Sequence, residues 1–351
     1  MAEALRWAVS MTEHREPIAI IGAGSWGTAL SLTLGRAGRT VHLWARRKEL
    51  AEKISRHRHN PDYLAEYELS DSVTATADLH AALAAARLVI LAVPSQGMAE
   101  VAARLASALA EDTRAVISAA KGLGPVSGKR LSMIVSEQLG PAWSTRLAVL
   151  SGPNLAPEVA AGHATVTVVA SHSSECAAEA QAGLSTPRFR VYTNPDVLGV
   201  ELGGVLKNII AIGAGISDGL GFGENTKAAL ITRGLTEMTR LGVALGAEAN
   251  TFRGLSGVGD LVATCASRKS RNHLVGYELA RGKSLAAIVA EMAPQVAEGV
   301  ETTRAALRLA ASAEVEMPIA AAVHSVMFEG VAPEDAVKAL MTRAWRDELD
   351  G

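Results

Sequence analysis

The sequence predicts a two-domain chain in which an α/β domain with a doubly wound, mostly parallel sheet precedes an all-α domain. Short apolar runs with strand character alternate with helical segments from Pro17 to Asn194. A glycine-rich turn joins the first of these strands to the first helix, which is typical of a βαβ unit. Beyond Pro195 the strand signals stop, and helical patterns separated by glycine turns continue to Gly351. This change of pattern predicts the boundary between the domains.

Length, composition and charge agree with this organisation and exclude several classes of function. The chain has 351 residues, of which 49% are hydrophobic and 20% are charged, as expected for a globular protein of about two domains. The formal net charge of -2 provides no overall basic field for nucleic acid or an anionic membrane. Two cysteines, Cys176 and Cys265, are too few for a disulfide framework, so a reducing, cytoplasmic location is expected.

The order of the predicted elements divides the chain into three parts. Residues 1–16 lack the uninterrupted apolar core of a secretory signal and are expected to form a loose tail. The sheet domain is expected to span residues 17–194 and the helical domain residues 195–351. Strands are expected at residues 18–21, 40–44, 73–76, 88–93, 115–119, 147–150, 166–170 and 189–192. Two of these regions, LVILAVP and AVISAAKG, have the continuous apolar character of strands buried on both faces.

The turn after the first strand has the pattern Gly-x-Gly-x-x-Gly, formed by Gly22, Gly24 and Gly27. In a Rossmann-type unit the first glycine permits a tight turn, the second admits a pyrophosphate, and the third lets helix and strand pack closely. The helix N-terminus then attracts the phosphate charge. The alternative is a glycine-rich turn that only fits the helix to the sheet. The strand before it and the helix after it favour dinucleotide binding.

The end of the second strand bears on the choice of cofactor. An NAD site usually carries an acid there for the ribose 2′-hydroxyl, whereas this chain has Arg46 and Arg47. Arginines suit a 2′-phosphate, so NADP(H) is favoured and NAD(H) stays an alternative. Solvated loop arginines are the other interpretation.

The ends of later strands are expected at the edge of the sheet where a ligand would meet the cofactor. Lys121 follows an apolar strand beside a glycine, and it is either a ligand-binding cation or an ordinary surface lysine. Residues 151–154, with the sequence Ser-Gly-Pro-Asn, form another unusual strand end. His57 and His59 lie in a polar loop without nearby cysteines or paired carboxylates at ligand spacing, so no metal site is expected.

The stretch from Val197 to Ser217 is nearly all apolar but carries Lys207 near its middle. In a helix, Lys207 shares a face with Gly203 and Gly204, and so small a face admits close approach of another segment. A helix that is apolar all round is buried in protein or in a membrane, and charged residues such as Glu201 and Lys207 make the membrane unfavourable. A buried lysine either transfers protons or belongs to a structural ion pair.

Further charged residues follow in the helical half. Asp260 lies where it could cap a helix, but it could also be the partner that a buried Lys207 requires. The run Arg268 to Asn272, with the sequence Arg-Lys-Ser-Arg-Asn, is either a solvated loop or an anion site. Together with Lys121 and Lys207, this run predicts a phosphate pocket.

These residues and motifs make the chain similar to a known family. It resembles the bacterial NAD(P)-dependent glycerol-3-phosphate dehydrogenases from about Ile18 to Arg346. The resemblance rests on GAGSWGTAL, AAKGL, SGPNLAPE, NPDVLGVELGGVLKNIIAIGAGISDG, TRGLTEM, GLSGVGDLVATC, SRN and AEGVETT, in the family's order and spacing. It implies a Rossmann-type domain, an all-helical domain and an active site in the cleft between them. It also implies reversible, NAD(P)H-dependent reduction of dihydroxyacetone phosphate to sn-glycerol 3-phosphate for glycerophospholipid synthesis, and it suggests a homodimer.

The resemblance implies roles for individual residues. Lys207 matches the general acid of reduction and base of oxidation, and it forms a catalytic set with Asp260 and Lys121. Position 154 is often serine or threonine in relatives, and Asn154 can still donate and accept hydrogen bonds. The implied substrate-binding residues are Lys121, Gly152, Asn154, Lys207, Asp260, Ser270, Arg271 and Asn272. The cofactor-binding residues, including the glycine turn, are Gly22, Gly24, Ser25, Trp26, Gly27, Arg46, Arg47, Lys121, Ala156, Arg271, Val296 and Glu298.

Two other functions are compatible with the same pattern. A reductase with the same two domains could act on a carboxylated ketone, although Lys121, Lys207 and the Ser-Arg-Asn run favour a phosphate. A nucleotide-sensing module would bind NADP(H) without turnover.

Overall fold

The computed structural model describes residues 16–345 and residue 347, which form two compact units. The sheet unit comprises residues 16–120 and Leu131–Val197, and the helical unit comprises Lys121–Arg130 and the described residues from Leu198 onward. The expected tail at residues 1–16 lies, except for Glu16, outside the described residues. The ten-residue segment Lys121–Arg130 therefore packs with the helices although the chain on both sides of it belongs to the sheet unit.

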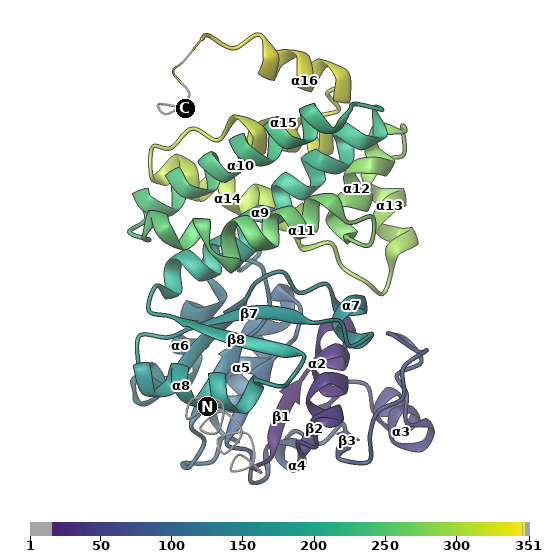
Figure 1. Ribbon diagram of the computed structural model, residues 1–351, viewed down its shortest axis with the longest axis vertical. Coiled ribbons are helices and arrows are strands. Elements are labelled where there is room, and N and C mark those ends of the chain that lie inside the picture. Colours follow the sequence, from purple (N-terminus) through teal and green to yellow (C-terminus); the bar gives the residue numbers. More distant parts are fainter. Residues whose placement is uncertain (1–15, 346, 348–351) are drawn as a thin grey trace. The chain divides into compact units, whose positions relative to one another are not determined.

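The sheet unit is built on an eight-stranded sheet with the order β3-β2-β1-β4-β5-β6-β7-β8 (Figure 1). Neighbouring strands run parallel except β6 and β7, which are antiparallel. The predicted doubly wound, mostly parallel sheet is thus confirmed. The strands are β1 (Ile18–Ile21), β2 (Val41–Trp44), β3 (Val73–Thr76), β4 (Leu88–Leu91), β5 (Ala115–Ser118), β6 (Leu147–Ser151), β7 (Thr165–Ala170) and β8 (Phe189–Asn194).

Alternate residues of each central strand point to opposite sides of the sheet, so both faces are apolar and helices cover both of them. Ile18 and Ile20 of β1 belong to a core shared with α2, α3, α7 and α8, whereas Ala19 and Ile21 belong to one shared with α4, α5 and α6. These helices are α2 (Ser25–Arg36), α3 (Lys48–His57), α4 (Leu79–Leu83), α5 (Met98–Ala106), α6 (Leu131–Leu139), α7 (Ala156–Ala160) and α8 (Ser174–Leu184). Burial on both sides explains why the central strands β1, β4 and β5 are almost entirely apolar.

The helical unit is organised around α9 (Val197–Gly219), as the green and yellow helices of Figure 1 show. Its apolar side chains, among them Leu206, Ile209 and Ile212, are fully buried. By length and composition α9 could cross a membrane, but 89% of its most apolar window is buried within the protein, as in the core helix of a globular protein. The other helices are α10 (Glu224–Ala244), α11 (Asp260–Ala266), α12 (Arg271–Ala280), α13 (Leu285–Met292), α14 (Glu298–Ser312), α15 (Pro318–Phe328) and α16 (Pro333–Met341).

Glycines bring two other segments into direct contact with the backbone of α9. A Cβ atom on Gly203 would lie 2.7 Å from the carbonyl oxygen of Ser256, just before α11. A Cβ atom on Gly276 of α12 would lie 1.9 Å from the carbonyl oxygen of Ile212. Both distances are shorter than side-chain atoms tolerate, so only glycine permits this packing. The close approach predicted for the Gly203 face of α9 is confirmed, and it sets α11 and α12 directly against α9.

Candidate functional site

Two lysines of the helical unit share the carboxylate of Asp260. The Nζ atom of Lys207 lies 2.9 Å from Oδ1 of Asp260, and the Nζ atom of Lys121 lies 2.7 Å from Oδ2. The Asp260 side chain is 2% exposed, and those of Lys207 and Lys121 are 7% and 17% exposed. In their charged forms the three groups carry one net positive charge, so the cluster attracts an anion or an oxygen that is gaining negative charge.

The backbone before Asp260 explains how its carboxylate reaches the lysines. A π-helical turn at Leu255–Gly259 leads into α11, and Asp260 is the first residue of that helix rather than its cap. Gly259 is the N-cap residue and no side chain in the described part of the chain caps the helix, so the capping interpretation of Asp260 is wrong. Thr264, one turn later on the same face, accepts a hydrogen bond of 2.6 Å from Nζ of Lys207. Its own hydroxyl donates to the carbonyl oxygen of Asp260.

Burial changes the proton affinity of one lysine in this cluster. Removal from water lowers the pKa of Lys121 to about 8, the charge of Asp260 opposes this shift, and the charge of Lys207 adds to it. Lys121 is therefore a cation at pH 7 that loses its proton at mildly alkaline pH. A cation with this property can respond to the charge of a bound ligand.

A chain of amide hydrogen bonds connects the lysine cluster with α12 and α14. Nδ2 of Asn208 donates to the carbonyl oxygen of Lys121 at 3.3 Å, and Oδ1 of Asn208 accepts from Nδ2 of Asn272 at 2.8 Å. The Oδ1 atom of Asn272 then accepts from the backbone N–H of Gly299 at 3.0 Å. Neither Asn208 nor Thr264 was predicted as a site residue from the sequence. The signal for Asn208 was present, because an amide inside an apolar helix needs partners when it is buried.

The predicted anion-binding run coincides with the N-terminus of α12. Ser270 is the N-cap, and its hydroxyl oxygen accepts from the backbone N–H of His273 at 3.2 Å. Asn272 is buried, whereas Arg271 is exposed. The structure thus brings Asn272 to the helix that carries Lys207 and leaves Arg271 accessible to solvent.

In the sheet unit, the predicted glycine turn has the geometry of a phosphate cradle. Gly22 has a φ of +119°, and a Cβ atom there would lie 2.6 Å from the carbonyl oxygen of Ala92. Among the described residues, a Cβ atom at Gly24, the N-cap of α2, would have no neighbour within 4 Å, and no side chain caps the helix. The first N–H groups of α2 are therefore open to a ligand phosphate. This arrangement fits the pyrophosphate of a dinucleotide.

The remaining predicted residues of the sheet unit lie in varied environments. Trp26, on α2, packs near Phe189, and its buried Nε1 atom lacks a hydrogen-bond partner among the described residues. Asn154 is hydrogen-bonded to β7: its Nδ2 donates to the carbonyl oxygen of Val166, and its Oδ1 accepts from the hydroxyl of Thr167. Gly152 has a φ of +137° and Ala156 begins α7. Arg46 and Arg47 are exposed after β2, and Arg47 forms an ion pair with Asp62.

The last predicted cofactor residues lie at the start of α14. Glu298 is the first residue of this helix, and Val296 precedes it by two positions.

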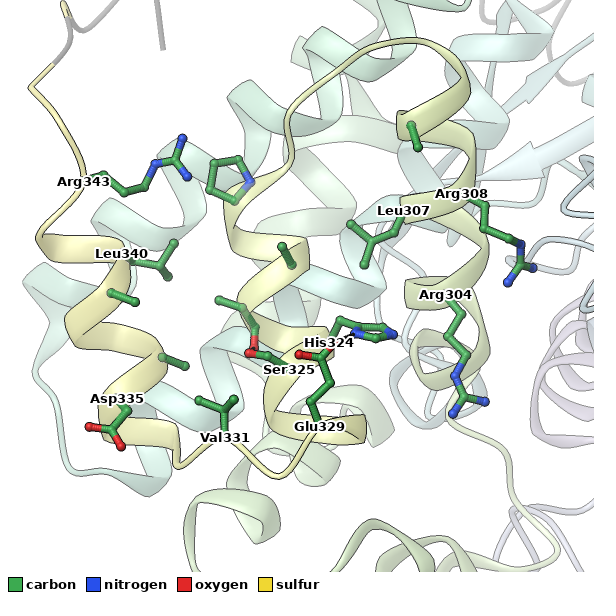
Figure 2. Close-up of a pocket in the computed structure, with 16 residues that line it drawn as sticks. Arg304, Leu307, Arg308, His324, Ser325, Glu329, Val331, Asp335, Leu340 and Arg343 are labelled. Atoms are coloured by element: carbon green, nitrogen blue, oxygen red, sulfur yellow. Dashed lines mark hydrogen bonds and ion pairs between the residues drawn. The ribbon is translucent and has the colours of Figure 1, made fainter.

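A groove of about 890 Å³ opens elsewhere in the helical unit, between α14, α15 and α16, and is lined by none of the predicted site residues (Figure 2). Within the described ranges, no three His, Cys, Asp or Glu side chains come together as a metal site would require.

A mostly parallel sheet with a Gly-x-Gly-x-x-Gly turn after its first strand, followed by a helical unit with a buried lysine–aspartate cluster, indicates a two-domain NAD(P)-dependent dehydrogenase. Sequence comparison identifies the family within this class. Residues 17–177 match the N-terminal part of NAD-dependent glycerol-3-phosphate dehydrogenase, and residues 196–338 match its C-terminal part. The chain belongs to the NAD(P)-dependent glycerol-3-phosphate dehydrogenase family.

Individual relatives are similar over nearly their whole length. Glycerol-3-phosphate dehydrogenase [NAD(P)+] of Geobacillus kaustophilus strain HTA426 is 48% identical over 336 residues, which cover 95% of this chain and 97% of the relative. A second such enzyme, from Salinibacter ruber strain DSM 13855 / M31, is 46% identical over 94% of this chain and 96% of its own. The crystal structure of glycerol-3-phosphate dehydrogenase from Coxiella burnetii has a TM-score of 0.88 and 40% identity, covering 94% and 99% of the two chains.

Replacing Asp260 tests the electrostatics of the cluster directly. We expect Asp260→Asn to lower the free energy of unfolding at pH 7 by about 3–5 kcal/mol, because two buried ammonium groups lose their shared counter-charge. Part of this loss should be recovered at pH 9. The pKa of Lys121 is below its usual value, so above pH 8 the unfolded chain binds more protons than the folded one and stability rises with pH. Denaturation followed by circular dichroism measures both values, and a variant as stable as the parent at pH 7 would contradict the description of the cluster.

Proposed function

We propose that this protein reduces dihydroxyacetone phosphate to sn-glycerol 3-phosphate with NAD(P)H, and that it catalyses the reverse reaction with NAD(P)+. The observation that carries the proposal is the buried Asp260 carboxylate held between Lys207 and Lys121. The net positive charge of these three groups suits a carbonyl oxygen that becomes negative during reduction. Two relatives named glycerol-3-phosphate dehydrogenase [NAD(P)+] are 46% and 48% identical to the chain, which supports the same substrate here.

In this proposal Lys207 is the proton donor of reduction. A nicotinamide cofactor, when bound, supplies the hydride that adds to C2 of the ketone. Lys207 has three N–H bonds, and its described contacts with Asp260 and Thr264 engage two of them. In the proposal the remaining N–H donates to the substrate oxygen, which takes the proton as the C–O double bond becomes a single bond. In oxidation the neutral amine of Lys207 takes the proton back.

The other residues of the helical unit bind and orient the substrate in this scheme. Asp260 holds the Lys207 ammonium in place, and Lys121 adds positive potential beside the reacting carbonyl. Arg271 and Asn272, at the N-terminus of α12, bind the phosphate with the Ser270 end of the helix. Binding energy from the phosphate then holds C2 in position for reaction. Gly152 and Asn154 of the sheet unit belong to the proposed substrate set through the family resemblance.

The glycine turn of the sheet unit is the proposed binding site for the cofactor pyrophosphate. Arg46 and Arg47 are proposed to receive the 2′-phosphate of NADP(H), and Arg46 is the better placed because Arg47 already pairs with Asp62. NADP(H) is therefore the preferred cofactor in this proposal. The family resemblance adds the remaining proposed contacts, which are Ser25, Trp26, Lys121, Ala156, Arg271, Val296 and Glu298.

The proposal also includes a supply of sn-glycerol 3-phosphate for phospholipid synthesis, a cytoplasmic location and a homodimer. The phospholipid role and the homodimer rest on the family resemblance, and the cytoplasmic location rests on the low cysteine content. Cell fractionation and sedimentation of the purified protein measure the last two.

A turnover assay separates the proposed function from its two alternatives. We expect rapid oxidation of NADPH on addition of dihydroxyacetone phosphate, slower oxidation of NADH, and little turnover of ketones that carry a carboxylate in place of the phosphate. Preference for the carboxylated ketones would replace the substrate assignment. Tight NADPH binding with no turnover of either substrate class would indicate a nucleotide-sensing module.

The role of Lys207 is tested by Lys207→Met, which keeps an unbranched side chain of similar length and removes the ammonium group that carries the proton. We expect turnover of dihydroxyacetone phosphate to be abolished while NADPH binding, measured by calorimetry, stays nearly unchanged. Asp260 retains Lys121 as a partner, so the variant should fold. Lys338→Met on α16, which lies outside the cluster, is the matched control and should keep the parent activity. Turnover of the Lys207 variant near the parent rate would rule out its assignment as proton donor.

A further inference from the structure

The segment Lys121–Arg130 forms a hairpin arm within the helical unit. Leu123 and Arg130 form an antiparallel bridge, and the N–H of Gly124 donates to the carbonyl oxygen of Lys129 at 2.8 Å. Gly128, with a φ of +67°, closes the turn at the tip by donating to the carbonyl oxygen of Gly124. Lys121 is the first residue of the arm, so the position of the arm decides where its ammonium lies.

One face of α9 contacts this arm at three successive levels. Glu201, Val205 and Asn208 are spaced by four and three residues, so they lie on the same side of the helix. Oε2 of Glu201 lies 2.9 Å from Nη1 of Arg130, which ends the arm. Val205 shares a buried apolar cluster with Leu123 of the arm, and Asn208 donates to the carbonyl oxygen of Lys121.

The ion pair at the far end of this face has no place in the proposed chemistry. Glu201 precedes Lys207 by six residues, or about 9 Å along the helix axis. Its side chain is 4% exposed, and that of Arg130 is 22% exposed. A carboxylate so deeply buried in an apolar helix needs a cationic partner, and Arg130 supplies it. The pair therefore holds the returning strand of the arm against α9.

We propose that Arg130 and Glu201 are positioning residues for Lys121. Their ion pair fixes one end of the hairpin arm to α9, while the Asp260 carboxylate holds the other end through Lys121. Because both ion pairs lie on or beside α9, the arm keeps the Lys121 ammonium in a fixed position relative to Lys207. This inference rests on the proposed function, since it assigns the ion pair to the same reaction.

Breaking the pair should affect turnover through Lys121 alone. We expect Arg130→Met to lower kcat for dihydroxyacetone phosphate by about 10- to 100-fold, as displacement of a charged group by about 1 Å can do. In a Lys121→Met background the same substitution should change kcat by less than about twofold, because the residue through which it acts is absent. Arg130→Lys, which keeps the cation, should recover part of the activity.

A second comparison separates positioning from stability. Arg130→Met removes a cationic partner of the buried Glu201 carboxylate, so the variant should unfold at lower denaturant concentration. Adding Glu201→Gln removes the buried charge and should restore stability without restoring kcat. Arg343→Met, which breaks an exposed pair with Glu316 in the same unit, is the matched control and should retain the parent kcat.

Two results would overturn the proposal. One is an equal fall in kcat when Arg130→Met is made with and without Lys121, and the other is a kcat that returns with stability in the Arg130→Met and Glu201→Gln double variant.

A parent protein without turnover would instead refute the proposed function. In that case amide exchange still tests the arm, and faster exchange at residues 123–130 in Arg130→Met than in the parent is the expected result. Unchanged exchange at these residues would refute the claim that the Arg130–Glu201 ion pair holds the arm against α9.

Discussion

The site depends on one buried carboxylate that holds two ammonium groups. Without Asp260, the ammonium of Lys207 on α9 would lack its counter-charge, and that of Lys121 would have no reason to approach a second cation. With it, the cluster keeps a net positive charge in a place from which water is largely excluded. Such a preorganised charge is most effective where negative charge develops on a substrate oxygen.

The helix α9 provides the frame on which this cluster is assembled. It meets the π-helical turn before Asp260, the phosphate-binding end proposed for α12, and the hairpin arm that carries Lys121. Gly203 allows one of these contacts at backbone distance, and Asn208 hydrogen-bonds to two of the three segments. A helix that is buried on all sides can therefore fix several charged groups relative to one another.

Local sequence patterns predicted the parts of this structure that depend on local forces. The apolar runs predicted the central strands β1, β4 and β5 because these are buried on both faces. The isolated charge of Lys207 predicted a buried partner such as Asp260. The interactions of Thr264 and Glu237 were not predicted. Glu237, whose pKa burial raises to about 7, accepts hydrogen bonds from the first N–H groups of α15, about eighty residues away. The docking of residues 121–130 with the helices also depends on contacts distant in sequence, which no local pattern reveals.

The pH dependence of catalysis tests the central claim, that the ammonium pair on Asp260 is the reactive centre. The claim predicts that kcat/KM for dihydroxyacetone phosphate falls above about pH 8, where Lys121 loses its proton. In Lys121→Arg the guanidinium stays charged, so the fall should move to higher pH. The same alkaline fall in parent and variant would contradict the claim.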